Sequence, residues 1–153
     1  MKEKSTKELE NELKKTHITD LSNFLYENDD VMISDDRPFK SYMKKIIDEK
    51  NIKRQTIFLR ADIPERYGYK LLSEEKRTKQ RDVILRICYA AEFSLEEAQK
   101  ALRIYQMPKL YIVYPRDSVL MKCFDERPGG IIEVNEILRL KGFDTLRTSG
   151  LQE

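Results

Sequence analysis

The chain has 153 residues, of which 40% are apolar and 37% are charged, and its net charge is +2. This length suits one domain, or one core with an extension, and the longest apolar run, Leu110 to Tyr114, is too short to cross a bilayer. The first residues lead into a charged segment without an apolar signal region, so we expect a cytoplasmic protein that makes no membrane contact.

The first 37 residues predict an acidic helical arm and a connector. Thr6 to Lys15 predicts a weak amphipathic helix, and Asp20 to Tyr26 predicts a short second one. The Asp-rich stretch from Asn28 to Arg37 ends before Pro38 and is typical of a connector between the arm and the core.

The middle of the chain predicts three helices in quick succession. Apolar residues recur at i, i+3, i+4, i+7 and i+8 between Phe39 and Ile47, the stripe of a helix that lies on a core. After a break at Asn51, Arg54 to Ala61 and Glu65 to Leu72 predict two short helices joined by a tight turn. Pro64 suits the first position of the second of these helices. A basic loop, residues 75–81, follows.

The second half contains one helical unit twice. Residues 81–89 align with 116–124 at an offset of 35, and residues 94–103 align with 130–139 at an offset of 36. Each unit predicts an αα-hairpin whose apolar faces must be covered by neighbours. Tyr105, Tyr111 and Tyr114 are predicted to lie in the hairpin core.

An arginine–aspartate pair opens each unit, as Arg81-Asp82 and as Arg116-Asp117. We interpret the pairs as helix starts, in which aspartate accepts from backbone N–H groups and arginine bridges the hairpins. For Arg81 alone, contact with a phosphate is the alternative.

The charge is unevenly distributed along the chain. Residues 1–36 hold five lysines against ten acidic residues (net −5), residues 37–86 fifteen basic against seven acidic (net +8), and residues 87–153 nine against ten (net −1). A basic block between acidic ends fits either a phosphate-binding surface or an ordinary solvated helical surface.

This order of helices resembles the lambda-repressor and Cro type of helix-turn-helix, the Xre family. The resemblance is carried by the helix from Phe39, by residues 52–61 as the first motif helix, by Ile63 in the turn and by residues 65–72 as the recognition helix. With the hairpin at 95–99 included, the chain also looks like bacterial Xre-like regulators that carry a helical C-terminal extension. The turn position that usually holds glycine is Asp62 here, and aspartate tolerates left-handed geometry.

The resemblance implies an all-α fold in three parts. These are an acidic arm and connector (1–37), a helix-turn-helix DNA-binding domain (38–106) and a C-terminal helical hairpin extension (107–153). The implied function is a transcriptional regulator that occupies an operator in double-stranded DNA. A homodimer or a protein partner would bind through the C-terminal hairpins.

Base readout requires long polar side chains on one short helix, and affinity requires cations around it. The predicted base-reading residues are Arg66, Tyr69 and Lys70, of which Arg66 suits a bidentate contact with guanine. The predicted contacts with the DNA backbone are Lys53, Arg54, Gln55, Thr56, Lys76, Arg77 and Lys79.

An enzyme and a protein-interaction adaptor are the alternatives to a regulator. An enzyme is not expected, because the only histidine is His17 and the chain has no Gly-rich phosphate loop. Cys88 and Cys123 lack metal-binding spacing and are predicted to be buried, so no metal or cofactor is expected. The alternative is a helical protein-interaction adaptor that has lost DNA binding, because Glu65 opens the recognition helix where it would repel phosphate.

Overall fold

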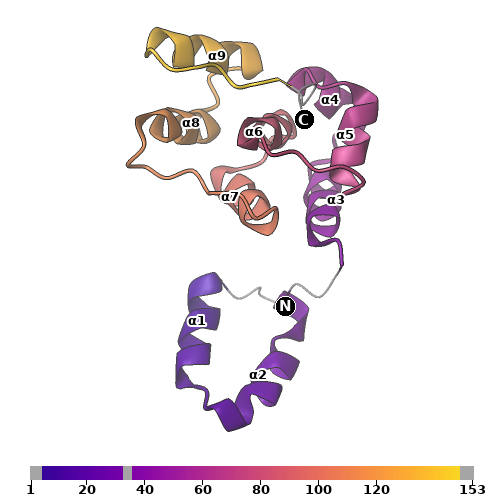
Figure 1. Cartoon of the computed structure of the whole chain (residues 1–153), viewed down its shortest axis with the longest axis vertical. Coiled ribbons are helices and arrows are strands. Elements are labelled where there is room, and N and C mark those ends of the chain that lie inside the picture. Colours follow the sequence, from indigo (N-terminus) through magenta and orange to yellow (C-terminus); the bar gives the residue numbers. More distant parts are fainter. Residues whose placement is uncertain (1–4, 33–35, 149–153) are drawn as a thin grey trace. The chain divides into compact units, whose positions relative to one another are not determined.

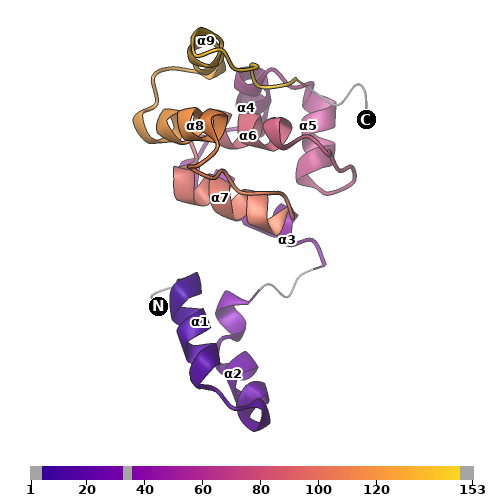
Figure 2. The same cartoon turned by 60° about the vertical axis from the view of Figure 1, so that its left-hand side comes forward.

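All regular structure in the described ranges, residues 5–32 and 36–148, is helical in the computed structural model, which confirms the predicted all-α class. The chain divides into two units, residues 1–38 and 39–153, and each is described by itself (Figures 1 and 2). Residues 33–35 of the predicted connector lie outside the described ranges.

The first unit consists of short helices with little buried surface. Helix α1 (Thr6–Lys15) begins with Ser5, whose hydroxyl accepts from the Glu8 N–H, and a 3-10 turn (Ile18–Asp20) leads into α2 (Leu21–Glu27). A second 3-10 turn (Asp29–Val31) follows α2. These bounds agree with the two helices predicted for the arm.

The second unit contains seven helices within the described residues: α3 (Pro38–Lys50), α4 (Arg54–Ala61), α5 (Glu65–Leu72), α6 (Arg81–Ala90), α7 (Leu95–Ile104), α8 (Pro115–Glu126) and α9 (Ile131–Leu140). The predicted break between α3 and α4 occurs at Asn51, which has a φ of 57°. Pro64 precedes α5 instead of occupying its first position, and so that detail of the prediction is wrong.

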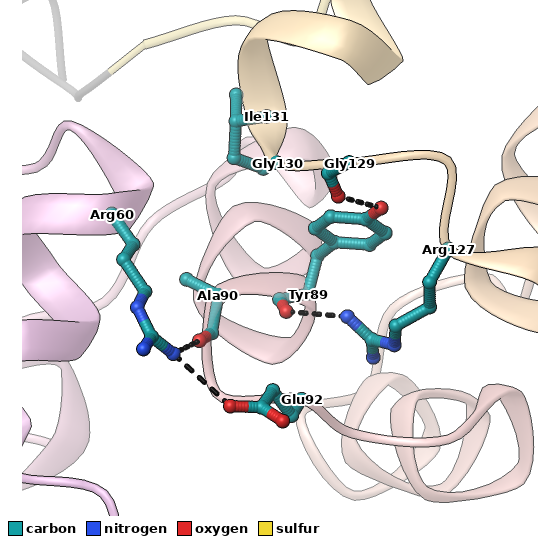
Figure 3. Close-up of a pocket in the computed structure, with 8 residues that line it drawn as sticks. All are labelled: Arg60, Tyr89, Ala90, Glu92, Arg127, Gly129, Gly130 and Ile131. Atoms are coloured by element: carbon teal, nitrogen blue, oxygen red, sulfur yellow. Dashed lines mark hydrogen bonds and ion pairs between the residues drawn. The ribbon is translucent and has the colours of Figure 1, made fainter.

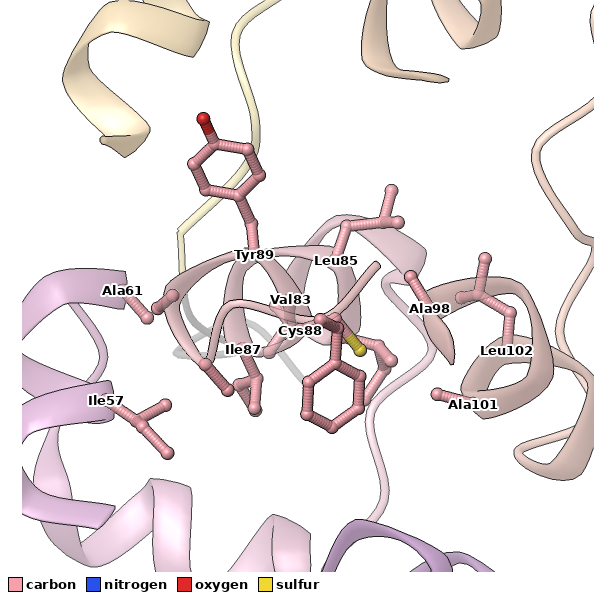
Figure 4. Close-up of a cluster of buried hydrophobic side chains, with 14 of the residues drawn as sticks. Ile57, Ala61, Val83, Leu85, Ile87, Cys88, Tyr89, Ala98, Ala101 and Leu102 are labelled. Atoms are coloured by element: carbon pink, nitrogen blue, oxygen red, sulfur yellow. The ribbon is translucent and has the colours of Figure 1, made fainter. Parts of the chain in front are cut away.

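Helix α6 forms the centre of this unit. Residues 82–90 are all buried, and Figure 4 shows α6 lying between α4 and α7 with apolar side chains pointing to both. Cys88 and Cys123 are buried among these side chains, as predicted, and burial raises the pKa of both thiols. The core continues into α8 and α9, so residues 107–148 share one core with the helices before them.

The two sequence repeats, which begin at Arg81 and at Arg116, are joined by two reciprocal ion pairs. Arg81 at the start of α6 donates from both terminal nitrogens to Asp117 of α8, at 2.6 and 3.2 Å, and Arg116 at the start of α8 donates to Asp82 of α6, at 3.0 and 3.1 Å. Each aspartate also accepts one backbone N–H, from Tyr111 for Asp117 and from Arg147 for Asp82. The arginines therefore bridge the hairpins, as predicted. The predicted capping is wrong, because the aspartates bind the N–H groups of Tyr111 and Arg147 and not those of their own helix starts.

Further hydrogen bonds recur at an offset of 36. The Gln99 side chain binds the backbone of Leu110, and the Asn135 side chain accepts from the Leu146 N–H at the equivalent place. Leu110 and Leu146 are both 3% exposed, so each hairpin is followed by a tail anchored through one buried leucine. Repetition of the same contacts in both units supports the internal repeat inferred from the sequence.

Arg86 departs from this repeat, because its counterpart at an offset of 35 is Met121. Its buried guanidinium donates to the carbonyl of Ala61 at the end of α4 and to the carbonyls of Leu146 and Arg147. Burial lowers the pKa of Arg86, an effect opposed by the charges of Asp62 and Asp82. One side chain thus ties α4 to the C-terminal tail.

The prediction for the tyrosines is correct for one residue and wrong for two. Tyr105 is fully buried and lies 4.6 Å from Phe39, ring centre to ring centre. Tyr111 and Tyr114 are more than half exposed, whereas Leu110 directly before them is buried.

Candidate nucleic-acid interface

The turn between α4 and α5 is built around Asp62. Its backbone is left-handed, with φ 55° and ψ 50°, and its N–H donates to the Leu59 carbonyl, which closes the end of α4. Ile63 follows as a buried residue whose N–H donates to the Phe58 carbonyl. The predicted aspartate turn is therefore present, and three residues join the two helices.

Helices α4 and α5 approach closely because residue 68 is glycine. A Cβ atom at Gly68 would lie 2.4 Å from Cδ1 of Phe58, so any side chain there would displace the ring or the helix. Phe58 also contacts Tyr69 edge to face, with ring centres 5.1 Å apart. This packing fixes α5 against α4 and leaves the opposite face of α5 in solvent.

The outer face of α5 carries the residues predicted to read bases. Arg66 and Tyr69 are exposed three positions apart, and Lys70 is half-buried. Glu65 is exposed at the first position of the helix. The helix therefore presents one cation and one phenol with a carboxylate at its start.

A shallow hollow of about 150 Å³ lies beside this face. It is lined by Lys40, Lys44, Arg54, Tyr69, Leu72 and Ser73, which come from α3, α4, α5 and the residue after α5. The structure thus brings Tyr69 and Arg54, both predicted site residues, together with two lysines that the site prediction did not include. Lys40 and Lys44 belong to the basic block, but their position beside α5 depends on how α3 packs.

Asp48 links two of the cations around this hollow. Its carboxylate lies 2.8 Å from Nζ of Lys44 and 3.2 Å from Nη1 of Arg54. Hydrogen bonds from Lys44 and then from Arg54 lower the pKa of Asp48. The carboxylate orients both side chains and offsets part of their positive charge.

The other predicted backbone contacts lie in two places. Lys53 and Gln55 are exposed and Thr56 is half-buried at the start of α4, beside Arg54. Lys76 and Lys79 are exposed in the basic loop.

Arg77 of the same loop has a structural contact. Its Nη2 donates to the Tyr105 carbonyl at 2.8 Å, and its guanidinium lies 4.1 Å from the centre of the Tyr105 ring. The loop is thereby fastened to the end of α7. Arg77 is thus held at α7, whereas Arg54 lines the hollow beside α5.

A second hollow, of about 380 Å³, lies where α4 and α6 end and α9 begins (Figure 3). Its charged side chains all have partners in the protein. Arg60 pairs with Glu92 at 3.1 Å, and Arg127 donates to the Tyr89 and Phe93 carbonyls while lying over the Tyr89 ring. The Tyr89 hydroxyl donates to the Gly129 carbonyl. These contacts join α6 to the start of α9.

Comparisons with protein-family models, with curated proteins and with solved structures found no match to this chain. Within the described residues, no helix combines the length and apolar character needed to cross a membrane, and no cluster of three or more metal-ligating side chains occurs.

Proposed function

We propose that this chain is a sequence-specific DNA-binding regulator in which α4, the Asp62 turn and α5 act as a helix-turn-helix. In this proposal α5 enters the major groove and the start of α4 lies against the DNA backbone. Regulation follows from occupancy of an operator. The proposal keeps the Xre-like character expected from the sequence.

The observation that carries the proposal is the position of the outer face of α5 beside a cationic hollow. Arg66 is exposed on a helix that Gly68 holds against Phe58, and Tyr69 is 44% exposed while its ring packs edge to face on Phe58. Tyr69 also lines the hollow that contains Lys40, Lys44 and Arg54. A short helix with polar outer residues beside cations combines base readout with phosphate binding in one surface.

The roles divide according to side-chain chemistry. The planar guanidinium of Arg66 matches the two acceptors of guanine, a contact worth roughly 1–3 kcal/mol of discrimination. Lys44 and Arg54 are neutralised in part by Asp48 in the free protein, and a DNA phosphate would take the place of that carboxylate. The affinity should therefore fall steeply with rising salt.

The adaptor alternative has one observation in its favour. Glu65 is exposed at the start of α5, the part of a recognition helix that approaches DNA most closely, and its charge repels phosphate. Within the DNA proposal Glu65 accepts from the amino group of a cytosine. An adaptor predicts no salt-dependent affinity for DNA.

The test is a pull-down of genomic fragments with the purified full chain at about 150 mM salt, followed by a salt titration on any enriched fragment. We expect a recurrent sequence to be enriched and the logarithm of the binding constant to fall linearly with the logarithm of salt. Protein that is folded by circular dichroism and enriches no fragment would overturn the proposal.

Paired variants test the assigned residues. Loss of the arginine–guanine contact alone corresponds to about a 5- to 150-fold lower affinity. The double variant Arg66→Ala/Lys70→Ala should lose at least this much affinity for the enriched sequence and should no longer prefer it over random DNA. Arg139→Ala/Lys141→Ala removes two exposed cations at the end of α9 and should change the affinity little. Retained preference in the α5 variant would contradict the site assignment.

A further inference from the structure

The tail after α7 displays four consecutive large apolar side chains in solvent. Tyr111, Ile112, Val113 and Tyr114 are 56, 67, 63 and 61% exposed. Single exposed apolar residues are common on protein surfaces, but a contiguous uncharged strip marks an interaction surface. The strip is defined here as residues 111–114.

The backbone of the strip is held in place at both ends. The Tyr111 N–H donates to Asp117, the Ser118 hydroxyl donates to the Ile112 carbonyl, and the Tyr114 N–H donates to the Tyr111 carbonyl. Pro115 then begins α8. The side chains are therefore presented by an anchored turn, and their exposure follows from the hydrogen-bonded backbone.

The internal repeat shows that the fold does not require these side chains. Residues 147–150, the counterpart of the strip at an offset of 36, read Arg-Thr-Ser-Gly. Both tails have the buried leucine and the backbone N–H bond to an aspartate. The first tail alone adds an apolar strip, so a function beyond folding accounts for it.

We infer that the strip is the contact through which two copies of this chain associate. The strip carries no charge, so two copies placed around a twofold axis meet without electrostatic repulsion, and tyrosine is enriched at the centres of such contacts. Figure 1 shows the connection from α7 to α8 on the side of this unit away from α5. The contact therefore leaves the outer face of α5 open.

The size of the strip predicts a weak dimer. A fully covered tyrosine buries about 150–250 Å², so four side chains at this exposure offer on the order of 400 Å² per copy. A standard interface buries roughly 800 Å² per partner, twice that area. We therefore expect a weak, reversible dimer that is populated only at high protein concentration.

A reversible dimer also suits the proposed function, on which this part of the inference rests. One eight-residue helix contacts only a few base pairs, and two copies contact two half-sites. A protein that dimerises weakly in solution then binds a paired site cooperatively, because the DNA holds the two copies together.

The test is sedimentation velocity on the full chain from about 5 to 500 µM. The wild type should shift from monomer to dimer over this range, and Ile112→Lys should remain monomeric because it places a charge in the strip. Ile132→Lys, at a 76% exposed isoleucine of α9, is the matched control and should dimerise like the wild type. A monomeric wild type at every concentration, or an undiminished dimer in both Ile112→Lys and Tyr114→Lys, would overturn the inference.

Binding to DNA separates this inference from the proposed function. Ile112→Lys should keep its affinity for a single half-site and lose the cooperative gain on a paired site. If neither the wild type nor Ile112→Lys binds DNA but only the wild type dimerises, the proposed regulator function is refuted and the inferred self-association stands. Equal cooperativity of the wild type and Ile112→Lys on a paired site would refute the inference that the strip joins two copies on DNA.

Discussion

Replacing Arg81 by alanine should leave a buried carboxylate without its counter-ion. The Asp117 side chain is 4% exposed and accepts from both terminal nitrogens of Arg81. In the variant it keeps the hydrogen bond from the Tyr111 N–H, at 2.9 Å, but loses the guanidinium. Removal of one partner from a buried ion pair costs about 3–5 kcal/mol. Arg81 is itself 24% exposed, so water enters the space it leaves, and we expect the lower end of that range, about 3 kcal/mol. This is a large part of the 5–15 kcal/mol typical of a domain.

A double-mutant cycle in urea, followed by circular dichroism at pH 7, measures the coupling. The double variant Arg81→Ala/Asp117→Ala no longer contains the isolated charge, so it should be destabilised by at least about 1 kcal/mol less than the sum of the single variants. Lys122→Ala removes a cation whose two acidic partners are about two-thirds exposed, and it should leave the urea midpoint unchanged. Additive effects of the two alanine substitutions would refute the reasoning.

Two further predictions concern the packing of α5 and the contact between α3 and α7. Gly68→Ala should destabilise the protein by roughly 1–3 kcal/mol in thermal unfolding, because its Cβ would overlap the Phe58 ring, and Phe58→Leu in the same chain should recover part of the loss. An unchanged melting temperature would contradict this close approach. Burial acts to raise the pKa of Glu97, but hydrogen bonds from Lys50 and Ser94 outweigh burial, and the pKa is lowered. The ionised Glu97 therefore stabilises the fold above its unfolded-state pKa, and this contribution is lost as the pH falls through its folded-state pKa. The difference in urea midpoint between wild type and Glu97→Gln should therefore shrink below about pH 4, and a constant difference from pH 3 to 7 would exclude this contribution.

The helices and turns of this chain were predictable because they depend on local chemistry. The bounds predicted for α4 and α5, Arg54–Ala61 and Glu65–Leu72, agree with the structure, since the apolar period and the left-handed tolerance of aspartate act within a few residues. The repeat was also predictable, because the two units align in sequence. Its reciprocal ion pairs followed in outline from the repeated Arg-Asp dipeptides.

The surroundings of the candidate site depended on contacts between distant residues. Lys40 and Lys44 line the hollow only because α3 packs beside α4 and α5, and Arg77 is fastened to Tyr105, 28 positions along the chain. Arg127 was not predicted to stack on Tyr89, since its position depends on the left-handed end of α8. A surface cation and a structural cation look the same in sequence, and only tertiary packing separates them.

Arg86 shows why the two halves of this unit act together. Its guanidinium holds the Ala61 carbonyl, the last of α4, and also the carbonyls of Leu146 and Arg147. The chain near residue 146 thereby helps to fix the end of α4, and Asp62 turns toward α5 directly after that end. Displacement of the C-terminal tail would leave the buried Arg86 guanidinium with one of its three carbonyl acceptors, that of Ala61, and would weaken its hold on the turn that orients Arg66 and Tyr69. The repeat is therefore part of what positions the proposed DNA-binding helix, in addition to presenting the strip proposed to join two copies.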